Sequence, residues 1–431
     1  MTRTDVLIAG AGPGGCAAAL AFVRSGARVT LIGPKGTPER GLFGEWLHPA
    51  GVTTLRDLGV ELDGEDFQRN DGFVVHPGTG RAPIRLGYVG GTAVSMPHHV
   101  LVERLREAAA ARPEVTVRLG ARLLEATPDG TAHTSIGVFE PDLLVGADGR
   151  ASVVRRAVAA DDVPGVALST TAGFELADVA LPVERHGHVF LGGPGTALAY
   201  RLAPGLIRLN LDIAPGRLAP AEALDYLRTH YAPVLPAEIR DAFLDVTARQ
   251  PVIRWAANRF RRKLRYGHEK LALVGDAVGF GHPLAAHGMT MAVMDAECLG
   301  RSSGVAAYAS ERRRRTWAPE RLGIALHRAF TDTGSLPLRE ALFWFWQNDP
   351  DERDRMMRLL AVQVTSRAAF SRAVAQIARV ALSSALGSGT VRSRYRSSIG
   401  LARWLGWLLS PEPSMSFAQR SPTTRDLRVG P

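Results

Sequence analysis

The chain has 431 residues, of which 46% are hydrophobic and 22% are charged, and its formal net charge is +10. These proportions are typical of a globular protein of two or three domains, and they exclude collagen-like, disordered and disulfide-stapled classes. Apolar runs fall short of the roughly 18 residues that span a bilayer, and we expect neither a signal peptide nor a nucleic-acid-binding module. The two cysteines, Cys16 and Cys298, fit a reducing cytoplasm.

The first predicted elements form a βαβ unit. Residues 6–9 indicate a buried strand, residues 16–24 an alanine-rich helix, and residues 29–32 a second buried strand. The turn Gly-Ala-Gly-Pro-Gly-Gly at 10–15 joins the first strand to the helix. A glycine turn between a strand and a helix predicts a site for the phosphates of a dinucleotide, because the backbone can approach them closely.

Three glycines of this turn have distinct structural roles. Gly10 permits the tight turn, Gly12 lets the backbone approach a pyrophosphate, and Gly15 lets the helix pack on the sheet. The helix start then offers N–H groups and a partial positive charge to the phosphates. The carboxylate that usually binds the ribose would follow the second strand, where the chain has Gly33-Pro34. The ribose must therefore be held differently, and the turn alone does not identify the cofactor.

The rest of the chain divides into three patterns. Helix 100–111 and strands 115–119, 143–145 and 271–274 continue the α/β pattern. From about residue 173 to residue 213, short strands broken by Gly and Pro predict an antiparallel sheet. Beyond about residue 316 the chain is expected to be mostly helical as far as residue 409.

Two further motifs follow predicted strands. The first begins Gly146-Ala147-Asp148-Gly149-Arg150 and enters a helix. The second begins Gly275-Asp276 and continues through His-Pro-Leu-Ala-Ala-His-Gly-Met at 282–289. In this order with the glycine turn, the motifs resemble those of the group A flavoprotein monooxygenases. The resemblance implies that FAD is the resident cofactor, that Asp276 binds a ribityl hydroxyl, and that residues 283–289 present backbone groups to the flavin.

A narrower resemblance is to the squalene epoxidase branch, over roughly residues 4 to 300. It rests on the stretch Gly44-Glu45-Trp46-Leu47-His48-Pro49-Ala50-Gly51, on the strand 188–192 with Tyr200 and Asp212 after it, and on the 282–290 segment. The chain has His48 where the family often has glutamine, Phe73 where it has tyrosine, and His98-His99 where it has arginine. These departures leave the substrate open.

The resemblance implies a set of site residues. The cofactor-binding set is Gly10, Gly12, Pro13, Gly14, Gly15, Gly33, Pro34, Arg40, Glu45, His98, Ala121, Asp148, Gly275, Asp276, Pro283, Gly288 and Met289. His48 and Phe73 are the candidate catalytic residues, with a structural or flavin-orienting role as the equal alternative for His48. Phe174 and Tyr200 are candidate substrate contacts, with core packing as the equal alternative. No metal is expected.

The implied chemistry is monooxygenation. NADPH or NADH would reduce FAD, and reduced flavin and O2 would form a C4a-hydroperoxide that donates an oxygen atom. The favoured reaction is epoxidation of a prenyl or terpenoid double bond in a lipophilic substrate, which needs no side-chain base. An aromatic hydroxylase of a quinone, polyketide or indole is the first alternative, and such a reaction gains from a base. An FAD-dependent isoprenoid reductase is the second, and an FAD-binding scaffold without turnover is the third.

The predicted architecture is an α/β fold of the group A flavoprotein monooxygenase type. A Rossmann-type FAD-binding domain is expected over 1–70, 95–158 and 258–318, and an antiparallel-sheet substrate domain over 71–94 and 159–257. A helical C-terminal region is expected over 319–431. The amphipathic stretch 396–409, with Trp404 and Trp407, favours contact with a membrane surface, whereas residues 320–385 favour packing on the substrate domain. The expected location is the cytoplasm, with or without that peripheral contact.

Overall fold

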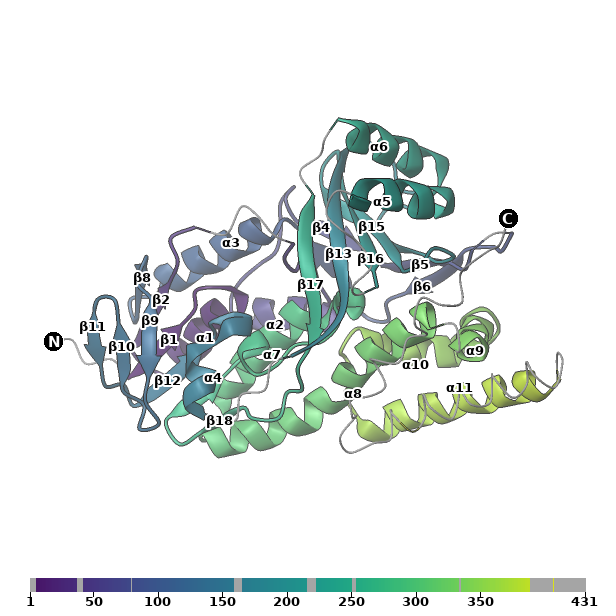
Figure 1. The fold of residues 1–431 in the computed structure, drawn as a ribbon. Helices are drawn as coiled ribbons and strands as arrows, with labels where there is room; N and C mark the ends of the chain where they lie inside the picture. The colour runs from purple at the N-terminus through teal and green to yellow at the C-terminus, as the bar shows by residue number, and fades with distance from the viewer. Residues whose placement is uncertain are drawn as a thin grey trace.

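Two large sheets organise the protein. The computed structural model describes residues 5–36, 42–78, 80–158, 165–214, 222–249, 253–332, 335–387 and residue 406. One sheet has six strands and is parallel apart from one edge pair, and the other has seven strands and is mostly antiparallel (Figure 1). Helices cover both sheets, as the predicted α/β fold class requires.

The six-stranded sheet has the order β18-β19-β12-β1-β2-β8. Its strands are β18 (Gly267–His268), β19 (Leu271–Leu273), β12 (Leu143–Gly146), β1 (Val6–Ala9), β2 (Val29–Gly33) and β8 (Val115–Leu119). The strands predicted from short buried apolar runs are therefore all present and lie side by side. Because β1, β12 and β19 are parallel neighbours, the segments that follow them meet at one edge of the sheet.

Three helices frame this sheet. They are α1 (Pro13–Arg24), α3 (His98–Ala110) and α7 (His287–Arg301). The helix predicted to begin at Cys16 begins instead at Pro13, because proline suits the first turn of a helix, where its missing N–H is not needed. Helices α1 and α7 pack closely: a Cβ at Gly300 would lie 2.6 Å from Cβ of Ala21.

The seven-stranded sheet has the order β17-β13-β16-β15-β14-β5-β6. Its strands are β17 (Arg254–Phe260), β13 (Val166–Ala177), β16 (Leu206–Ile213), β15 (Ala197–Ala203), β14 (His186–Phe190), β5 (Gly72–His76) and β6 (Ile84–Gly87). The predicted antiparallel pattern holds except between β14 and β5, which are parallel. Helices α5 (Ala223–Tyr231) and α6 (Ala237–Ala248) lie over one face of this sheet (Figure 1).

Four helices pack against the other face. They are α8 (Val305–Thr331), α9 (Leu336–Asn348), α10 (Pro350–Leu360) and α11 (Arg367–Gly387). Among the described residues, no helix is both long enough and apolar enough to cross a membrane. The stretch 396–409, for which membrane contact was predicted, lies outside the described residues apart from Gly406.

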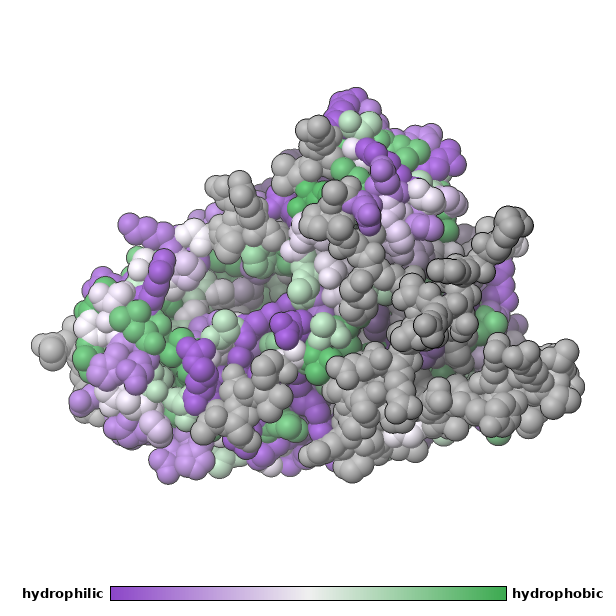
Figure 2. Space-filling model, viewed as in Figure 1, coloured by the Kyte–Doolittle hydropathy of each residue, from purple (hydrophilic) through white to green (hydrophobic). Residues whose placement is uncertain are grey.

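The remaining elements are short. Two three-stranded sheets consist of β3 (Trp46–Leu47), β7 (Ala93–Ser95) and β4 (Gln68–Asn70), and of β9 (Leu123–Ala126), β10 (Ala132–Thr134) and β11 (Gly137–Phe139). The short helices are α2 (Pro49–Asp57), α4 (Val153–Val158), η1 (Gly149–Ala151), η3 (Ala232–Val234), η4 (Gly275–Ala277) and η5 (Pro283–Ala285). Both cysteines are buried and unpaired, as predicted. On the face drawn in Figure 2, hydrophilic and hydrophobic side chains are interspersed.

Candidate active site

The three sequence motifs meet at the carboxyl edge of the six-stranded sheet. The glycine turn follows β1, the Asp148 motif follows β12 and the Asp276 motif follows β19. A Cβ at Gly10, whose φ is +112°, would lie 2.3 Å from the carbonyl oxygen of Ala147. The first and second motifs are therefore in contact, and only glycine fits at this point.

The second and third motifs are joined by an ion pair. Arg150 Nε donates to Asp276 Oδ2 at 3.2 Å, and its guanidinium lies over the ring of Phe280 at 5.2 Å. Gly275 N–H donates to Asp295 Oδ2, and Asp295 is itself held by the buried Arg312 at 2.6 Å. The buried pair of Asp295 and Arg312 thus fixes the backbone of the third motif at Gly275. The neighbouring Asp276 stays partly exposed at the carboxyl edge of the sheet.

The absence of a ribose carboxylate after β2 has a packing reason. A Cβ at position 33 would lie 2.6 Å from Cβ of Ala11, so no acidic side chain can stand there. Instead, Arg106 of α3 donates to the carbonyls of Ala11, Pro34 and Lys35 at 2.9 to 3.2 Å. This arginine ties the glycine turn to the end of β2. Ala121 lies just beyond β8 and follows Gly120, whose N–H donates to the carbonyl oxygen of Gly33. Arg40 lies outside the described residues.

We call residues 282–288, between the third motif and α7, the flavin turn. The turn holds the 3₁₀ helix η5 and the left-handed residue Ala286, whose φ is +50°. The backbone of His48 donates to Oγ1 of Thr290 at 3.0 Å, which fixes the segment before α2 against α7. His287 lies within 2.9 Å of the carbonyl of Leu360 and 3.3 Å of that of Pro319, so the turn also contacts α8 and α10.

His48 lies in a buried, directional chain of hydrogen bonds. Its Nε2 lies 2.8 Å from the carbonyl oxygen of Ala285 in the flavin turn, so Nε2 carries the proton and donates. Its Nδ1 then accepts from the hydroxyl of Tyr88 at 2.8 Å, and that hydroxyl accepts from Trp46 Nε1 at 3.1 Å. Both ring nitrogens are therefore engaged.

Burial and the nearby His287 lower the pKa of His48 from 6.5 to about 3, so the imidazole is neutral at neutral pH. Its one basic nitrogen, Nδ1, is filled by Tyr88. The geometry thus favours a residue that orients the flavin turn over one that removes a proton from a substrate.

An apolar cavity lies next to the flavin turn. Phe73 and Val75 of β5, Leu86 of β6 and Val189 of β14 line it on the sheet side, and Leu284 lines it at the flavin turn. The rest of its wall comes from apolar residues of α8, α9, α10 and α11. The lining side chains are hydrophobic, and their one buried N–H donor is Nε1 of Trp346, which has no hydrogen-bond partner within the described residues. A largely lipophilic ligand is therefore the one that the cavity suits.

Comparisons with known proteins agree with this geometry. The family model of squalene epoxidase matches residues 140–315. A mitochondrial squalene epoxidase of Arabidopsis thaliana is 31% identical over 315 residues, which cover 68% of this chain and 52% of that protein. A squalene epoxidase of Aspergillus fumigatus is 31% identical over 322 residues, covering 69% of this chain and 66% of the other. The chain is a squalene epoxidase-like flavoprotein.

Other relatives widen the range of chemistry. The 6-methylpretetramide 4-monooxygenase of Streptomyces rimosus is 29% identical over 318 residues, covering 68% of this chain and 73% of that enzyme. The structure of PqsL of Pseudomonas aeruginosa in complex with 2-aminobenzoylacetate superposes with a TM-score of 0.65 at 24% identity, over 77% of this chain and 97% of that one. This structural likeness supports the fold. The chain spans about half the length of the plant epoxidases, 52% in one and 57% in another.

The residues present fit FAD, the cofactor that goes with this assignment. A Cβ at Gly12 or at Gly288 would meet nothing within 4 Å, so open space lies before the starts of α1 and α7. Two helix starts facing open space suit a pyrophosphate and an electron-rich ring system. Buried Oδ1 of Asp148 has no hydrogen-bond partner within the described residues, while its Oδ2 accepts from Val153 N–H. An acceptor left unpaired in this way suits a ligand hydroxyl.

The other predicted cofactor residues of this flavoprotein divide into two groups. Pro283 and Gly288 are exposed at the flavin turn, and Pro13 opens α1. Gly14, Gly15 and Met289 are needed for packing: a Cβ at Gly14 would touch Ala292, one at Gly15 would collide with the carbonyl of Gly10, and Met289 packs beside Gly44. Nδ1 of His98 donates to the carbonyl oxygen of Gly44 at 2.9 Å.

Glu45 and Tyr200 are partners of each other. The buried carboxylate of Glu45 receives two hydrogen bonds from Arg208, at 2.6 and 2.9 Å, and one from the hydroxyl of Tyr200 at 2.8 Å. This ion pair fixes the loop before β3 on the seven-stranded sheet. Tyr200 therefore helps to hold this loop through Glu45, and it does not line the apolar cavity.

Phe174, predicted as a substrate contact, is placed elsewhere. Its ring is 1% exposed and packs edge-on against Phe243 of α6, at 5.2 Å between centroids. The β13 residue faces α5 and α6, and the cavity lies on the opposite face of the sheet. Phe174 therefore does not line this cavity, because alternation along a strand does not reveal which face borders it, and its contact with a substrate stays a prediction. Phe73 does line the cavity.

Sequence reasoning missed four residues of this site. The hydroxyl of Tyr88 lies between His48 and Trp46 and orients the imidazole. Arg106 joins the glycine turn to the end of β2. Leu284 belongs both to the flavin turn and to the cavity lining. A tyrosine between two glycine-rich segments and an arginine within an amphipathic helix carry no local signal. Their partners lie 40 or more residues away in the chain.

Proposed function

We propose that the chain is an FAD-dependent monooxygenase that epoxidises a double bond in a lipophilic prenyl or terpenoid substrate. The balanced reaction is alkene, O2, NAD(P)H and a proton giving epoxide, water and NAD(P)+. The observation that carries this proposal is the cavity beside the flavin turn, whose lining is apolar except for the indole N–H of Trp346. NADPH and NADH are both candidate electron donors, because the chain has a single glycine fingerprint and no second one for a nicotinamide cofactor.

FAD, once reduced, supplies the activated oxygen, and the protein supplies position and dryness. The turn at 10–15 and the start of α1 would hold the pyrophosphate, and Asp276 would bind the ribityl chain. The flavin turn would present backbone groups to the ring, held in place by His48 through Ala285. The apolar wall excludes water from the reacting double bond and positions it through contacts with Phe73 and Leu284.

The site favours an alkene over a phenol. Epoxidation removes no proton from the substrate, whereas attack on a phenol gains from a base near its hydroxyl. His48 is the base that the sequence predicts, yet its Nε2 donates to Ala285 and its Nδ1 accepts from Tyr88. A neutral imidazole with both nitrogens engaged has no free lone pair for a substrate proton.

Aromatic hydroxylation is the second candidate. It is supported by the similarity to 6-methylpretetramide 4-monooxygenase. That reading needs a base near the substrate hydroxyl, and the one N–H group of the described lining residues, Nε1 of Trp346, can donate a hydrogen bond but cannot act as a base. A third candidate, reduction of isoprenoid double bonds, would use the same cofactor without O2.

The deciding experiment supplies the FAD-loaded protein with NADPH or NADH, 18O2 and a panel of squalene, shorter prenyl alkenes and aromatic polyketides. We expect an epoxide, or its diol, that carries one 18O atom, from a prenyl or terpenoid alkene. A labelled phenol would replace epoxidation with hydroxylation, and a saturated, unlabelled product would indicate a reductase. Cofactor oxidation that yields only hydrogen peroxide with every member of the panel would contradict the proposal.

Two further points belong to this proposal. The FAD-binding, substrate and C-terminal parts are proposed with the boundaries predicted from the sequence. The cytoplasmic location is proposed as well. Limited proteolysis with and without FAD tests the boundaries, and we expect FAD to protect residues 1–70, 95–158 and 258–318 most. Fractionation of expressing cells tests the location.

A further inference from the structure

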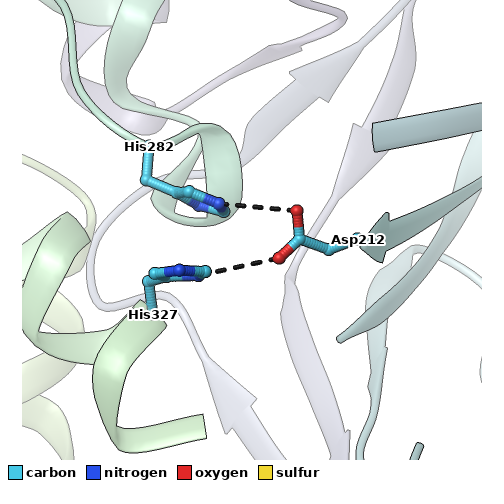
Figure 3. A group of neighbouring side chains, drawn as sticks. All are labelled: Asp212, His282 and His327. Atoms are coloured by element: carbon cyan, nitrogen blue, oxygen red, sulfur yellow. Dashed lines mark ion pairs between the residues drawn. The ribbon is translucent and has the colours of Figure 1, made fainter. Parts of the chain in front are cut away.

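A buried polar cluster lies between the flavin turn, the substrate sheet and α8. Asp212, at the end of β16, faces two histidines: His282, which opens the flavin turn, and His327 of α8 (Figure 3). The two imidazole rings stack with centroids 3.8 Å apart and planes 23° apart, and both point toward the carboxylate. The cluster is outside the chemistry assigned above.

The proton on His282 can be assigned from its contacts. The backbone N–H of Leu284, inside the flavin turn, donates to Nδ1 of His282 at 3.1 Å. A neutral imidazole has one donor and one acceptor, so Nε2 carries the proton. Nε2 then donates to the hydroxyl of Ser169 at 2.9 Å and lies 3.5 Å from Oδ1 of Asp212.

Asp212 is held from two other strands. Its Oδ1 accepts from the hydroxyl of Ser169 of β13 at 2.5 Å and from Nδ2 of Asn258 of β17 at 3.1 Å. Although burial raises the pKa of Asp212, its side-chain hydrogen bonds with His282 and Ser169 oppose this effect, so that the pKa falls below its ordinary value. The carboxylate is thus a fixed negative charge on the protein side of the flavin turn.

His327 completes the cluster from the cavity wall. Its Nδ1 is buried 3.7 Å from Oδ2 of Asp212 and has no hydrogen-bond partner within the described residues. Its neighbours Leu326 and Ala325 line the apolar cavity, as does Leu284 of the flavin turn. The stacked histidines therefore link the wall of the cavity to the turn.

A metal ion is a poor explanation of the cluster. The three side chains have the ligand types and the proximity that a divalent metal requires. A metal at Nε2 of His282 would force the proton onto Nδ1, where it would face the N–H of Leu284. Metal-binding histidines donate their other ring nitrogen, and here that nitrogen accepts.

We propose that Asp212 and His327 are positioning residues for the flavin turn, acting through His282. Asp212 and Ser169 hold the imidazole whose Nδ1 caps the turn, and the ring of His327 braces it from α8. The proposal rests on the FAD binding of the proposed function and is independent of the substrate.

The test uses the full chain loaded with FAD and the variants Asp212→Asn, His327→Ala and His327→Phe. Asp225→Asn is the control, because it removes one negative charge from a side chain that is 85% exposed on α5. The readouts are the FAD dissociation constant, the visible spectrum of bound FAD and its midpoint potential. A role limited to folding would move the melting temperature and leave the midpoint potential of bound FAD unchanged.

Asp212→Asn is expected to weaken FAD binding on the order of tenfold, about 1.4 kcal/mol, and to make the midpoint potential more positive, because a fixed negative charge is lost. His327→Ala is expected to weaken FAD binding, and His327→Phe to restore it, because phenylalanine keeps the stacked ring. The two variants at position 327 test the proposal even if the Asp212 variant fails to fold.

Three outcomes would overturn the proposal. One is an Asp212→Asn protein whose affinity and potential equal those of Asp225→Asn. Another is a His327→Ala protein that binds FAD as the unaltered chain does. The third is stoichiometric binding of added Zn2+ that is lost in Asp212→Asn, which would replace the proposal with a metal site. If the variants change FAD affinity and midpoint potential as expected but the unaltered protein forms no oxygenated product, this proposal stands and the epoxidase assignment is contradicted.

Discussion

The cofactor edge and the substrate cavity are built in opposite ways. The cofactor edge consists of three short motifs, each directly after a parallel strand, and its key contacts are close approaches of glycines to neighbouring backbone. The cavity is lined by side chains from three strands of the seven-stranded sheet, from Leu284 and from the four helices α8 to α11. Glycines that must accept a close carbonyl tolerate no replacement, whereas apolar side chains that fill a wall exchange with little loss.

This difference explains why the cofactor is easier to assign than the substrate. A phosphate or a flavin demands specific backbone geometry, which leaves a fixed spacing in the sequence. A hydrocarbon demands only shape and the exclusion of water, which leaves no spacing at all. The following predictions would sharpen or break this contrast.

The largest effect is expected at Gly10. In Gly10→Ala the new Cβ would collide with the carbonyl of Ala147, and φ of +112° is unfavourable for alanine, so both the fold of the turn and FAD binding should fail. We expect less than roughly a tenth of the normal FAD content. The matched variant is Gly12→Ala, whose Cβ meets no protein atom and should weaken FAD while leaving the melting temperature of the apoprotein unchanged. Equal melting temperatures in both variants would break the contrast.

A smaller effect is expected in the cavity wall. Leu326→Gln places an amide among apolar side chains, and we expect KM for the alkene to rise about tenfold, because the half-buried leucine loses part of the roughly 1.5–3 kcal/mol that full burial gives. The FAD content should stay normal. Leu244→Gln, on the 37% exposed Leu244 of α6, is the control and should behave as the unaltered protein. Loss of FAD in Leu326→Gln would mean that the two regions are not separable.

Tyr88→Phe tests the chain of hydrogen bonds that joins the two regions. It leaves Nδ1 of His48 and Nε1 of Trp46 without their partner, which costs about 1–3 kcal/mol of stability. We expect kcat to fall roughly tenfold, since the flavin turn loses its support, while KM changes little. Tyr226→Phe, on α5, is the control. An unchanged kcat would show that the hydrogen bond from Tyr88 to His48 does not contribute to catalysis.

The smallest effect concerns pH. His48 has a pKa of about 3 in the folded protein against 6.5 in the free side chain, so the unfolded chain binds the extra proton first as pH falls. Its contribution to stability is complete above pH 6.5 and is lost progressively as pH falls toward 3, by at most about 1.4 kcal/mol per pH unit. Urea unfolding at pH 7, 6 and 5 should show a shallower decline in His48→Gln. If the free energy of unfolding declines equally with pH in both proteins, a group other than His48 binds the proton on unfolding.

The sequence by itself determined the FAD-binding edge. Buried strands such as residues 6–9 and 143–145 could be read from their apolar runs, and Gly10, Asp148 and Asp276 could be read from fixed spacing after them. Helix starts were displaced by a few residues, as at Pro13, because proline and capping shift the first turn. These features are local, so a short window of sequence contains their physical cause.

Only the tertiary structure decided which residues surround the apolar cavity and the flavin turn. Phe174 was assigned to the substrate from its strand, yet it faces α6, and Phe73 faces the cavity. Tyr88, Arg106, Asp212 and His327 act through partners distant in sequence. The face that a strand turns to a cavity, and the partner that a buried polar group finds, are set by how sheets and helices pack. No local pattern carries that information.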